Sequence, residues 1–293
     1  MFTGMPEGGA TSSGDRARRS LAGTRFADVR WVTETGSTNA DALALARDGA
    51  PEGVVVVADH QTAGRGRRDR RWVAPPGGSL LVSALLRPPA RAAGTVTLAA
   101  GVALAEAVAE VAGVEARLKW PNDLVVVLPG DGGERKLAGI LAEADWPAGS
   151  AISDGYRPPR PDERVVVVVG VGVNVVWPTD PAELGGDGAE VAGIAAALNW
   201  VGPEVDRAEL LVAFLRAFGD RYASLVADGP ADVLAAWRRR SATLGRRVRV
   251  DVGRDDVAGT AVDVTEEGHL VIDTVEGGRR TVTVGDVVHL RRV

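Results

Sequence analysis

The run VVVVVGVGV at residues 165–173 constrains the fold of this chain most strongly. β-Branched valines lose side-chain freedom in a helix and pack well on a pleated sheet, so the run predicts a strand. Because the run is apolar without alternation, we expect the strand to be buried within a sheet. The longer apolar stretch that contains it stops short of the ~18 residues of a membrane span and includes Asn174. The sequence therefore predicts a central strand of a soluble protein.

Other Val- and Leu-rich runs predict further strands of the same sheet, at residues 54–58, 79–86, 124–128 and 138–144. Ala-rich or periodic stretches predict helices at residues 37–47, 95–111, 206–226 and 231–240. The first helix is expected to start near Thr38, and Gly49 and Gly113 are expected just beyond two helix ends. Residues 149–163, rich in Pro, Gly and charge, predict an exposed excursion. Strands followed by late helices indicate an α+β fold.

The C-terminal part of the chain predicts a second, smaller domain. Short alternating runs separated by glycine-containing turns begin near Thr243 and predict about five strands. We therefore expect a mobile tail at residues 1–25, a large domain at 26–240 and a small β domain at 241–293. The tail contains no apolar stretch of the kind that a secretory signal needs.

Composition and charge exclude several kinds of site. The sequence has no cysteine, which excludes disulfides and cysteine nucleophiles and is compatible with the cytosol. The three histidines, His60, His269 and His289, are too scattered in the sequence for a metal cluster. The net charge is −5, and the basic residues are dispersed apart from one run, so neither nucleic acid nor membrane is an expected partner.

That basic run, GRGRRDRR at residues 64–71, follows a predicted strand. Gly64 and Gly66 allow backbone amides to approach an anion, and guanidiniums such as those of Arg65 and Arg67 bind carboxylate or phosphate. A phosphate-bearing ligand suits this loop. A solvated basic surface is the alternative interpretation of the run taken alone.

Three further segments combine polar groups with apolar surroundings. KWPND at residues 119–123 places an amide and a carboxylate together, or forms a turn. KLAGILAE at residues 136–143 places Lys136 at the mouth of an apolar strand, where its ammonium either enters a pocket or remains on the surface. GVGVNV at residues 170–175 places Asn174 in a valine strand, where its amide must find a partner.

Together with GSTN at residues 36–39, these segments resemble, in the same order, the signature segments of the biotin–protein ligase family. The resemblance covers roughly residues 30–290. It implies a mixed β-sheet catalytic domain with helices, like that of class II aminoacyl-tRNA synthetases, followed by an SH3-like β-barrel. It also implies that ATP activates biotin to biotinyl-5′-adenylate, and that the biotin is then transferred to a lysine of a biotin carboxyl carrier domain of an acyl-CoA carboxylase. Mg²⁺ would arrive with the ATP phosphates, and the reaction would be cytoplasmic.

The same resemblance implies roles for individual residues. The residues expected on the biotin side are Ser37, Thr38, Asn39, Gln61, Gly64, Arg65, Gly66, Arg67 and Lys136. The residues expected on the ATP side are Arg67, Arg70, Trp72, Asn122, Lys136 and Asn174. Lys136, Arg67 and Asp123 are the expected catalytic residues. The role of Asp123 stays open between orienting another group, contacting a metal and assisting the incoming lysine.

Three other functions remain as alternatives. A lipoate–protein ligase would perform the same two-step chemistry on another carboxylate. A biotin- or nucleotide-binding regulator would bind the same ligands without reaction, and a nucleic-acid-binding module would rest on the arginine run and the β domain. Some family members carry an N-terminal helix-turn-helix domain and repress transcription. Only about thirty residues without helical patterning precede the signature segments here, so we expect no repressor function.

Overall fold

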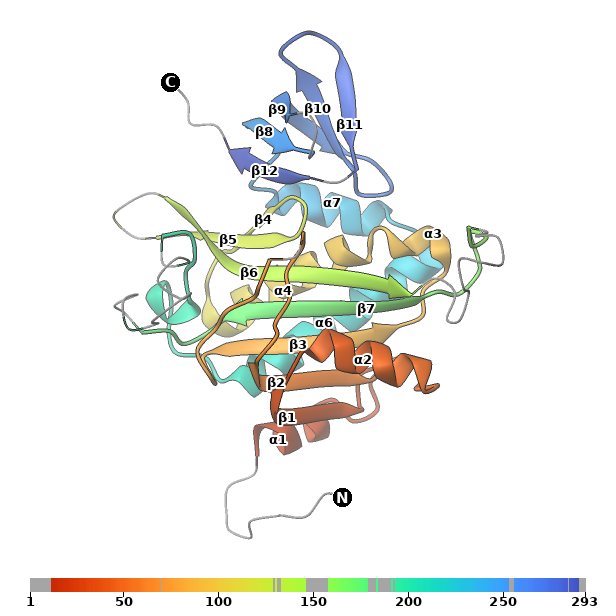
Figure 1. Cartoon of the computed structure of the whole chain (residues 1–293), viewed down its shortest axis with the longest axis vertical. Coiled ribbons are helices and arrows are strands. Elements are labelled where there is room, and N and C mark those ends of the chain that lie inside the picture. Colours follow the sequence, from red (N-terminus) through yellow and green to blue (C-terminus); the bar gives the residue numbers. More distant parts are fainter. Residues whose placement is uncertain are drawn as a thin grey trace.

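The computed structural model describes residues 12–68, 70–128, 130, 133–145, 158–178, 183, 191, 193–252, 256–283 and 285–289. These residues form a seven-stranded sheet and a five-stranded sheet. Figure 1 shows helices on the larger sheet and the smaller sheet at the C-terminal end.

The strands of the larger sheet are β1 Val29–Thr35, β2 Val55–Gln61, β3 Ser79–Leu86, β4 Arg117–Lys119, β5 Asp123–Val127, β6 Glu134–Asp145 and β7 Val166–Asn174. They lie side by side in the order β1-β2-β3-β7-β6-β5-β4. β1 and β2 are parallel, and the other neighbouring pairs are antiparallel. The mixed sheet confirms the predicted α+β class.

β7 lies at the centre of this sheet and is buried along its whole length, as the valine run predicts. Its alternating residues face two layers. Val167, Val169 and Val171 belong to the main core, whereas Val166 and Val168 pack in a second cluster under α2. The sheet therefore has a fully covered face and a face that α2 covers in part.

The described helical segments are α1 Ser13–Ser20, α2 Thr38–Arg47, α3 Ala90–Ala93, α4 Val96–Ala112, η3 Leu198–Trp200, α6 Arg207–Asp228 and α7 Ala231–Arg240. α2 begins where the sequence predicts, with Ser37 as its N-cap, and α4 ends at Gly113 in the left-handed conformation. α4 and α6 lie behind the sheet in Figure 1, and α2 lies in front of it. The described part of the chain contains no helix with the length and hydropathy that a membrane crossing requires.

The prediction of a mobile tail over residues 1–25 is wrong for the described part of that range. Residues 13–20 form α1, whose N-cap Ser12 accepts a hydrogen bond from the backbone N–H of Asp15. Ala17 and Leu21 are completely buried, and Arg16 forms an ion pair with Asp206 at the start of α6. The segment is small and polar, so its helical character depends on tertiary packing that the local sequence does not reveal.

β1 and β4 were not predicted as strands. β1 has the sequence VRWVTET and lies at the edge of the sheet, so most of its side chains are exposed and no long apolar run marks it. β4 has only three residues. Of the predicted excursion at 149–163, residues 149–157 lie outside the described residues, and residues 158–163 connect into β7 without regular structure.

The smaller sheet contains β8 Arg247–Asp251, β9 Asp256–Val264, β10 Leu270–Thr274, β11 Arg279–Val282 and β12 Asp286–His289. Its strands are antiparallel in the order β11-β10-β9-β8-β12, which confirms the predicted SH3-like domain of five strands. The KWPND segment joins the two sheets. Trp120 is buried, and both of its N–H groups bond to residues beyond the larger sheet. Its backbone N–H donates to Thr243 Oγ1 at 3.0 Å, and its indole N–H donates to the carbonyl of Gly268 at 2.9 Å.

Candidate active site

A cavity of about 480 Å³ opens on the face of the larger sheet that α2 covers in part, and β12 of the smaller sheet forms part of its wall. Thirteen of the predicted site residues line it: Ser37, Thr38, Asn39, Gln61, Arg65, Gly66, Arg67, Arg70, Trp72, Asn122, Asp123, Lys136 and Asn174. Gln61, Arg67 and Lys136 come from distant parts of the sequence and share this cavity. Gly64 is not among the lining residues, but it is close to two of them, since a Cβ atom there would lie 2.7 Å from the carbonyl oxygen of Trp72 and 3.2 Å from Gln61 Nε2.

Glycines form the floor of the cavity. Gly172 of β7 lies opposite Gly139 of β6 in the sheet. A Cβ atom at Gly172 would lie 2.6 Å from Trp72 Cε2, and one at Gly139 would lie 3.0 Å from Trp72 Cζ3. The indole ring of Trp72 can lie here only because both positions lack a side chain. Its Nε1 is buried and has no hydrogen-bond partner among the described residues.

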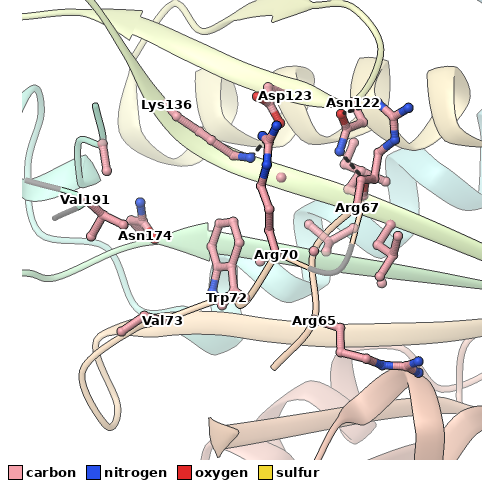
Figure 2. Close-up of a pocket in the computed structure, with 18 of the residues that line it drawn as sticks. Arg65, Arg67, Arg70, Trp72, Val73, Asn122, Asp123, Lys136, Asn174 and Val191 are labelled. Atoms are coloured by element: carbon pink, nitrogen blue, oxygen red, sulfur yellow. Dashed lines mark hydrogen bonds and ion pairs between the residues drawn. The ribbon is translucent and has the colours of Figure 1, made fainter. Parts of the chain in front are cut away.

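Lys136 and Asp123 lie above this ring, on β6 and at the start of β5 (Figure 2). Lys136 Nζ is 2.7 Å from Asp123 Oδ1, an ion pair without the alignment of a good hydrogen bond. The same ammonium is 5.6 Å from the centre of the Trp72 ring. Lys136 therefore points into the cavity, and the alternative in which its ammonium remains on the surface is wrong.

Polar side chains at the start of α2 form another part of the wall. The backbone N–H of Thr38 donates to Gln61 Oε1 at 2.7 Å, which orients the amide of Gln61. Ser37, Thr38 and Asn39 are all more than nine-tenths buried. The N-terminus of α2 therefore presents ordered hydrogen-bonding groups rather than flexible surface side chains.

The arginine loop is folded back on itself and bonded to the second domain. The backbone N–H of Trp72 donates to the carbonyl of Gly64 at 3.0 Å. Arg67 donates to Asn122 Oδ1 and to the carbonyl of Gly285, both at 3.3 Å, and Arg70 forms an ion pair with Asp286. Burial lowers the pKa of the Arg67 guanidinium, although Asp286 and Asp123 oppose that shift. The loop is thus a bridge between the two domains.

Asn174 and Asn122 are oriented by backbone groups at the cavity wall. Asn174 Nδ2 donates to the carbonyl of Ala196 at 2.9 Å, and its Oδ1 lies 3.5 Å from Ser79 Oγ. Asn122 Nδ2 donates to the carbonyl of Ile140 at 2.8 Å. Each amide is therefore held with its oxygen available to a further donor or cation.

The sequence prediction missed several groups that support the site. Ser83 is a buried hydroxyl in the apolar strand SLLVSALL, and Glu143 ends the KLAGILAE segment. Glu143 Oε2 accepts from Asn39 at 2.7 Å and from Arg65 at 3.1 Å. A polar residue in an apolar strand was a signal that could have identified Ser83. Asp286 had no such signal, because its position depends on how the second domain packs.

Glu134 links the two domains at the edge of the cavity. Its contacts make the stability of the fold dependent on pH. Its carboxylate contacts His289 Nδ1 at 2.9 Å and Arg246 at 2.8 Å. Hydrogen bonding with His289 lowers the pKa of Glu134, burial opposes the shift, and Arg246 adds to it. A carboxyl with a lowered folded-state pKa stabilises the fold above its unfolded-state pKa, and this contribution is lost as the pH falls through the folded-state value.

We therefore expect Glu134→Gln to lower the unfolding temperature near neutral pH and to have a progressively smaller effect below its ordinary pKa of about 4.5. Thermal unfolding of both proteins over a pH series would measure the difference. Asp162→Asn is a matched control, since Asp162 is exposed and its side chain pairs only with Arg91 among the residues that the structure describes. If the difference in unfolding temperature between Glu134→Gln and the parent protein stays constant down to acidic pH, the lowered folded-state pKa of Glu134 is contradicted.

Two family models match the sequence. The "Biotin/lipoate A/B protein ligase family" matches residues 32–146, and the "Biotin protein ligase C terminal domain" matches residues 243–290. The chain is 39% identical over 279 residues to a biotin--[acetyl-CoA-carboxylase] ligase of Mycobacterium tuberculosis, covering 92% of each chain. It is 32% identical to the enzyme of the same name from Paracoccus denitrificans, covering 87% of this chain and 98% of the relative.

Solved structures show the same fold. A biotin protein ligase from Aquifex aeolicus in complex with biotin and ATP has a TM-score of 0.69 and 25% identity, covering 91% of this chain and 100% of that one. A Helicobacter pylori enzyme with bound biotinylated ATP has a TM-score of 0.56 and 19% identity, covering 86% and 98%.

Proposed function

The chain belongs to the biotin/lipoate A/B protein ligase family, and from this premise we propose that its cavity converts biotin and ATP to biotinyl-5′-adenylate and transfers the biotin to a lysine. The observation that carries the proposal is the shared cavity of Gln61, Arg67 and Lys136. One part of this cavity offers ordered hydrogen-bonding groups and another offers cations. A neutral polar ring system with a carboxylate tail, lying beside a nucleotide, matches that division.

The first half-reaction must bring two anions together. The biotin carboxylate attacks the α-phosphorus of ATP, the new P–O bond forms, and pyrophosphate leaves. Fixed positive charge reduces the repulsion and stabilises the charge that develops on the phosphorus oxygens. Lys136 enters the cavity beside Asp123, 2.7 Å away, so we assign it to the meeting point of carboxylate and α-phosphate. Arg67 would contribute positive charge from the loop at residues 64–71.

The nucleotide would occupy the side of the cavity near Trp72. The indole face offers a stacking surface, and the unpartnered Nε1 offers a hydrogen-bond donor. Arg70, Asn122 and Asn174 would contact the phosphates or the base from the surrounding wall. In the described ranges no three His, Asp or Glu side chains converge as a metal site. Magnesium would therefore be held mainly by ATP phosphates, where it neutralises the leaving pyrophosphate.

In the second half-reaction, the neutral amine of the acceptor lysine attacks the acyl carbon. The C–N bond forms, the acyl–phosphate C–O bond breaks, AMP leaves, and the amine loses a proton. We propose that Asp123, the carboxylate paired with Lys136, orients that amine. The acceptor is proposed to be a biotin carboxyl carrier domain of an acyl-CoA carboxylase, since related ligases are named for that substrate. We propose a cytoplasmic location, which suits a cysteine-free chain.

Biotin-dependent exchange of pyrophosphate into ATP tests the first half-reaction directly. We expect exchange with biotin and none with lipoate. Exchange with lipoate alone would favour a lipoate ligase, and biotin binding measured by calorimetry without exchange would favour a regulator. Transfer is then tested by adding a carrier domain and measuring its biotin content by mass spectrometry.

Removing Arg67 should release the intermediate. We expect Arg67→Ala to increase the rate of biotinyl-adenylate loss about 10- to 100-fold, because a half-buried guanidinium bonded to Asn122 and Gly285 would no longer hold the loop closed. Adenylate in the filtrate of a single-turnover reaction measures that loss. Arg47→Ala removes an exposed arginine paired with Asp145 and is the control. If Arg67→Ala retains biotinyl-adenylate as well as the parent protein does, the loop does not hold the intermediate.

A further inference from the structure

We propose that Glu143 is a positioning residue that holds the first arm of the arginine loop, residues 64–66, against β6, and that it thereby sets how long biotin stays bound. The inference rests on the proposed binding of biotin. Glu143 is not among the residues that line the cavity, so it acts through Arg65, which does line it.

The arginine loop is a hairpin that is attached to both domains. Backbone hydrogen bonds pair residues 64–66 with residues 70–72. Arg65, in the first arm, bonds to Glu143 of β6, with 3.1 Å between Nη2 and Oε2. Three arginines further along the loop bond to the second domain instead: Arg67, Arg68 and Arg70. The first arm is thus attached to the larger sheet, and the rest of the hairpin to the smaller one.

The first arm lies beside the polar wall of the cavity. A Cβ atom at Gly64 would lie 3.2 Å from Gln61 Nε2, and Gln61 Oε1 accepts from the backbone N–H of Thr38 at 2.7 Å. This wall is the part of the cavity that we assign to the ring system of biotin, whereas the nucleotide is assigned to the side near Trp72. The attachment of the first arm therefore affects biotin more directly than ATP.

A buried amide holds the carboxylate of Glu143 in place. Gly170 of β7 lies between Ser83 of β3 and Leu141 of β6 in the sheet. The Asn39 amide lies over this glycine, where a Cβ atom would overlap Asn39 Oδ1. Asn39 Oδ1 accepts from Ser83 at 2.6 Å, while Nδ2 donates to the carbonyl of Leu141 at 3.2 Å and to Glu143 Oε2 at 2.7 Å. Both protons of Nδ2 are therefore used, and one of them fixes the carboxylate.

This support makes the ion pair of Glu143 and Arg65 stronger than an isolated surface pair. A surface pair stabilises little, partly because two mobile side chains must be held in one geometry. The side chain of Glu143 is 25% exposed and is already held by Asn39, so mainly Arg65 loses freedom when the pair forms. An ionised oxygen also binds a donor more strongly than a neutral one does. Glu143 is therefore a preformed anchor for the first arm.

The test is the rate at which biotin leaves the protein. Protein loaded with tritiated biotin is mixed with an excess of unlabelled biotin, and the bound label is followed with time. We expect Glu143→Gln to release biotin about 3- to 5-fold faster, because the amide oxygen can still accept from Asn39 but binds the Arg65 cation less strongly. The KM for ATP at saturating biotin should change less than about twofold, since the other arginines of the loop keep their own partners.

Asp145→Asn is the matched control. Asp145 lies on the same strand, its side chain is 27% exposed, and it pairs with Arg47 at 3.1 Å, a geometry close to that of Glu143 with Arg65. Arg47 belongs to α2 and not to the loop. Biotin release from Asp145→Asn should therefore equal that from the parent protein.

A double-mutant cycle with Arg65→Met tests whether Glu143 acts through Arg65. In the Arg65→Met background, Glu143→Gln should have almost no further effect on biotin release. Arg65→Lys provides a second measurement if Glu143→Gln is unstable, because Arg65 lies in an exposed loop. Lysine keeps the charge and lacks the planar guanidinium, so this variant should release biotin at a rate between those of the parent protein and Arg65→Met.

The outcomes separate this inference from the proposed function. A parent protein that does not bind biotin refutes the proposed function, and this inference with it. If the parent binds biotin, unchanged release from Glu143→Gln, or an undiminished effect of it in the Arg65→Met background, overturns the inference alone. Equally fast release from Asp145→Asn, or a KM for ATP that rises as much as the release rate, shows general loosening of β6 and overturns it as well. So does an Arg65→Lys variant that behaves like Arg65→Met.

Discussion

Replacing Lys136 with methionine is expected to slow biotin-dependent adenylate formation about 100- to 1000-fold while weakening biotin binding less than about tenfold. The ammonium is the cation that enters the cavity on β6 beside Asp123. Its charge matters most when the negative charge on the pentacoordinate phosphorus is greatest, and less when biotin alone is bound. Methionine keeps most of the side-chain length and removes the charge. Pyrophosphate exchange measures the rate, and calorimetry measures biotin affinity.

Lys119 provides the control, since it is the only other lysine of the chain. We expect Lys119→Met to have a much smaller effect on exchange. A comparable loss would indicate that the overall positive potential is important rather than the position of Lys136. Equal losses of rate and biotin affinity in Lys136→Met would show that Lys136 only binds the ground state.

The second large effect is expected from a single methyl group at Gly172. In Gly172→Ala the added Cβ would lie 2.6 Å from Trp72 Cε2 and 2.7 Å from Cζ2, so the indole must move. If Trp72 packs beside the nucleotide, the KM for ATP should rise about 10- to 100-fold through the loss of stacking and of the Nε1 donor. Initial rates over a range of ATP concentrations would measure this change.

A double-mutant cycle distinguishes displacement of Trp72 from other damage. Trp72→Ala removes the ring, so adding Gly172→Ala to it should have little further effect on the KM for ATP. Additive effects of the two substitutions would contradict the proposed cause. Gly219→Ala is a control for a harmless methyl, because the nearest atom, Phe26 Cε2, is 3.7 Å away.

The sequence predicted the parts of the fold that are encoded locally. The valine run of β7, the capped helix that begins at Thr38 and the alternating strands after Thr243 were all identified from their own residues. α1 and β1 were not identified, because their side chains are largely polar or small and their structure depends on neighbours. Arg16, for example, pairs with Asp206 from a distant helix.

The candidate site divides in the same way. Short motifs identified Gln61, Arg67 and Lys136, and the structure places them around one cavity. The motifs did not predict contacts between distant strands or domains. Asn39 was predicted to bind biotin directly, but its described hydrogen bonds are with Ser83, Glu143 and Leu141. A hydrogen bond that joins strands far apart in the sequence has no local signature.

The wall that Asp286 and Val287 contribute to the cavity has a consequence for how the protein is made. A ribosome synthesises the chain from its N-terminus, and the larger sheet can assemble before β12 emerges. The cavity is complete only once β12 has docked, so ligands would stabilise copies that contain this strand and leave chains terminated before it without this protection. Substrate supply in the cell would then selectively shield copies that contain β12 from proteases.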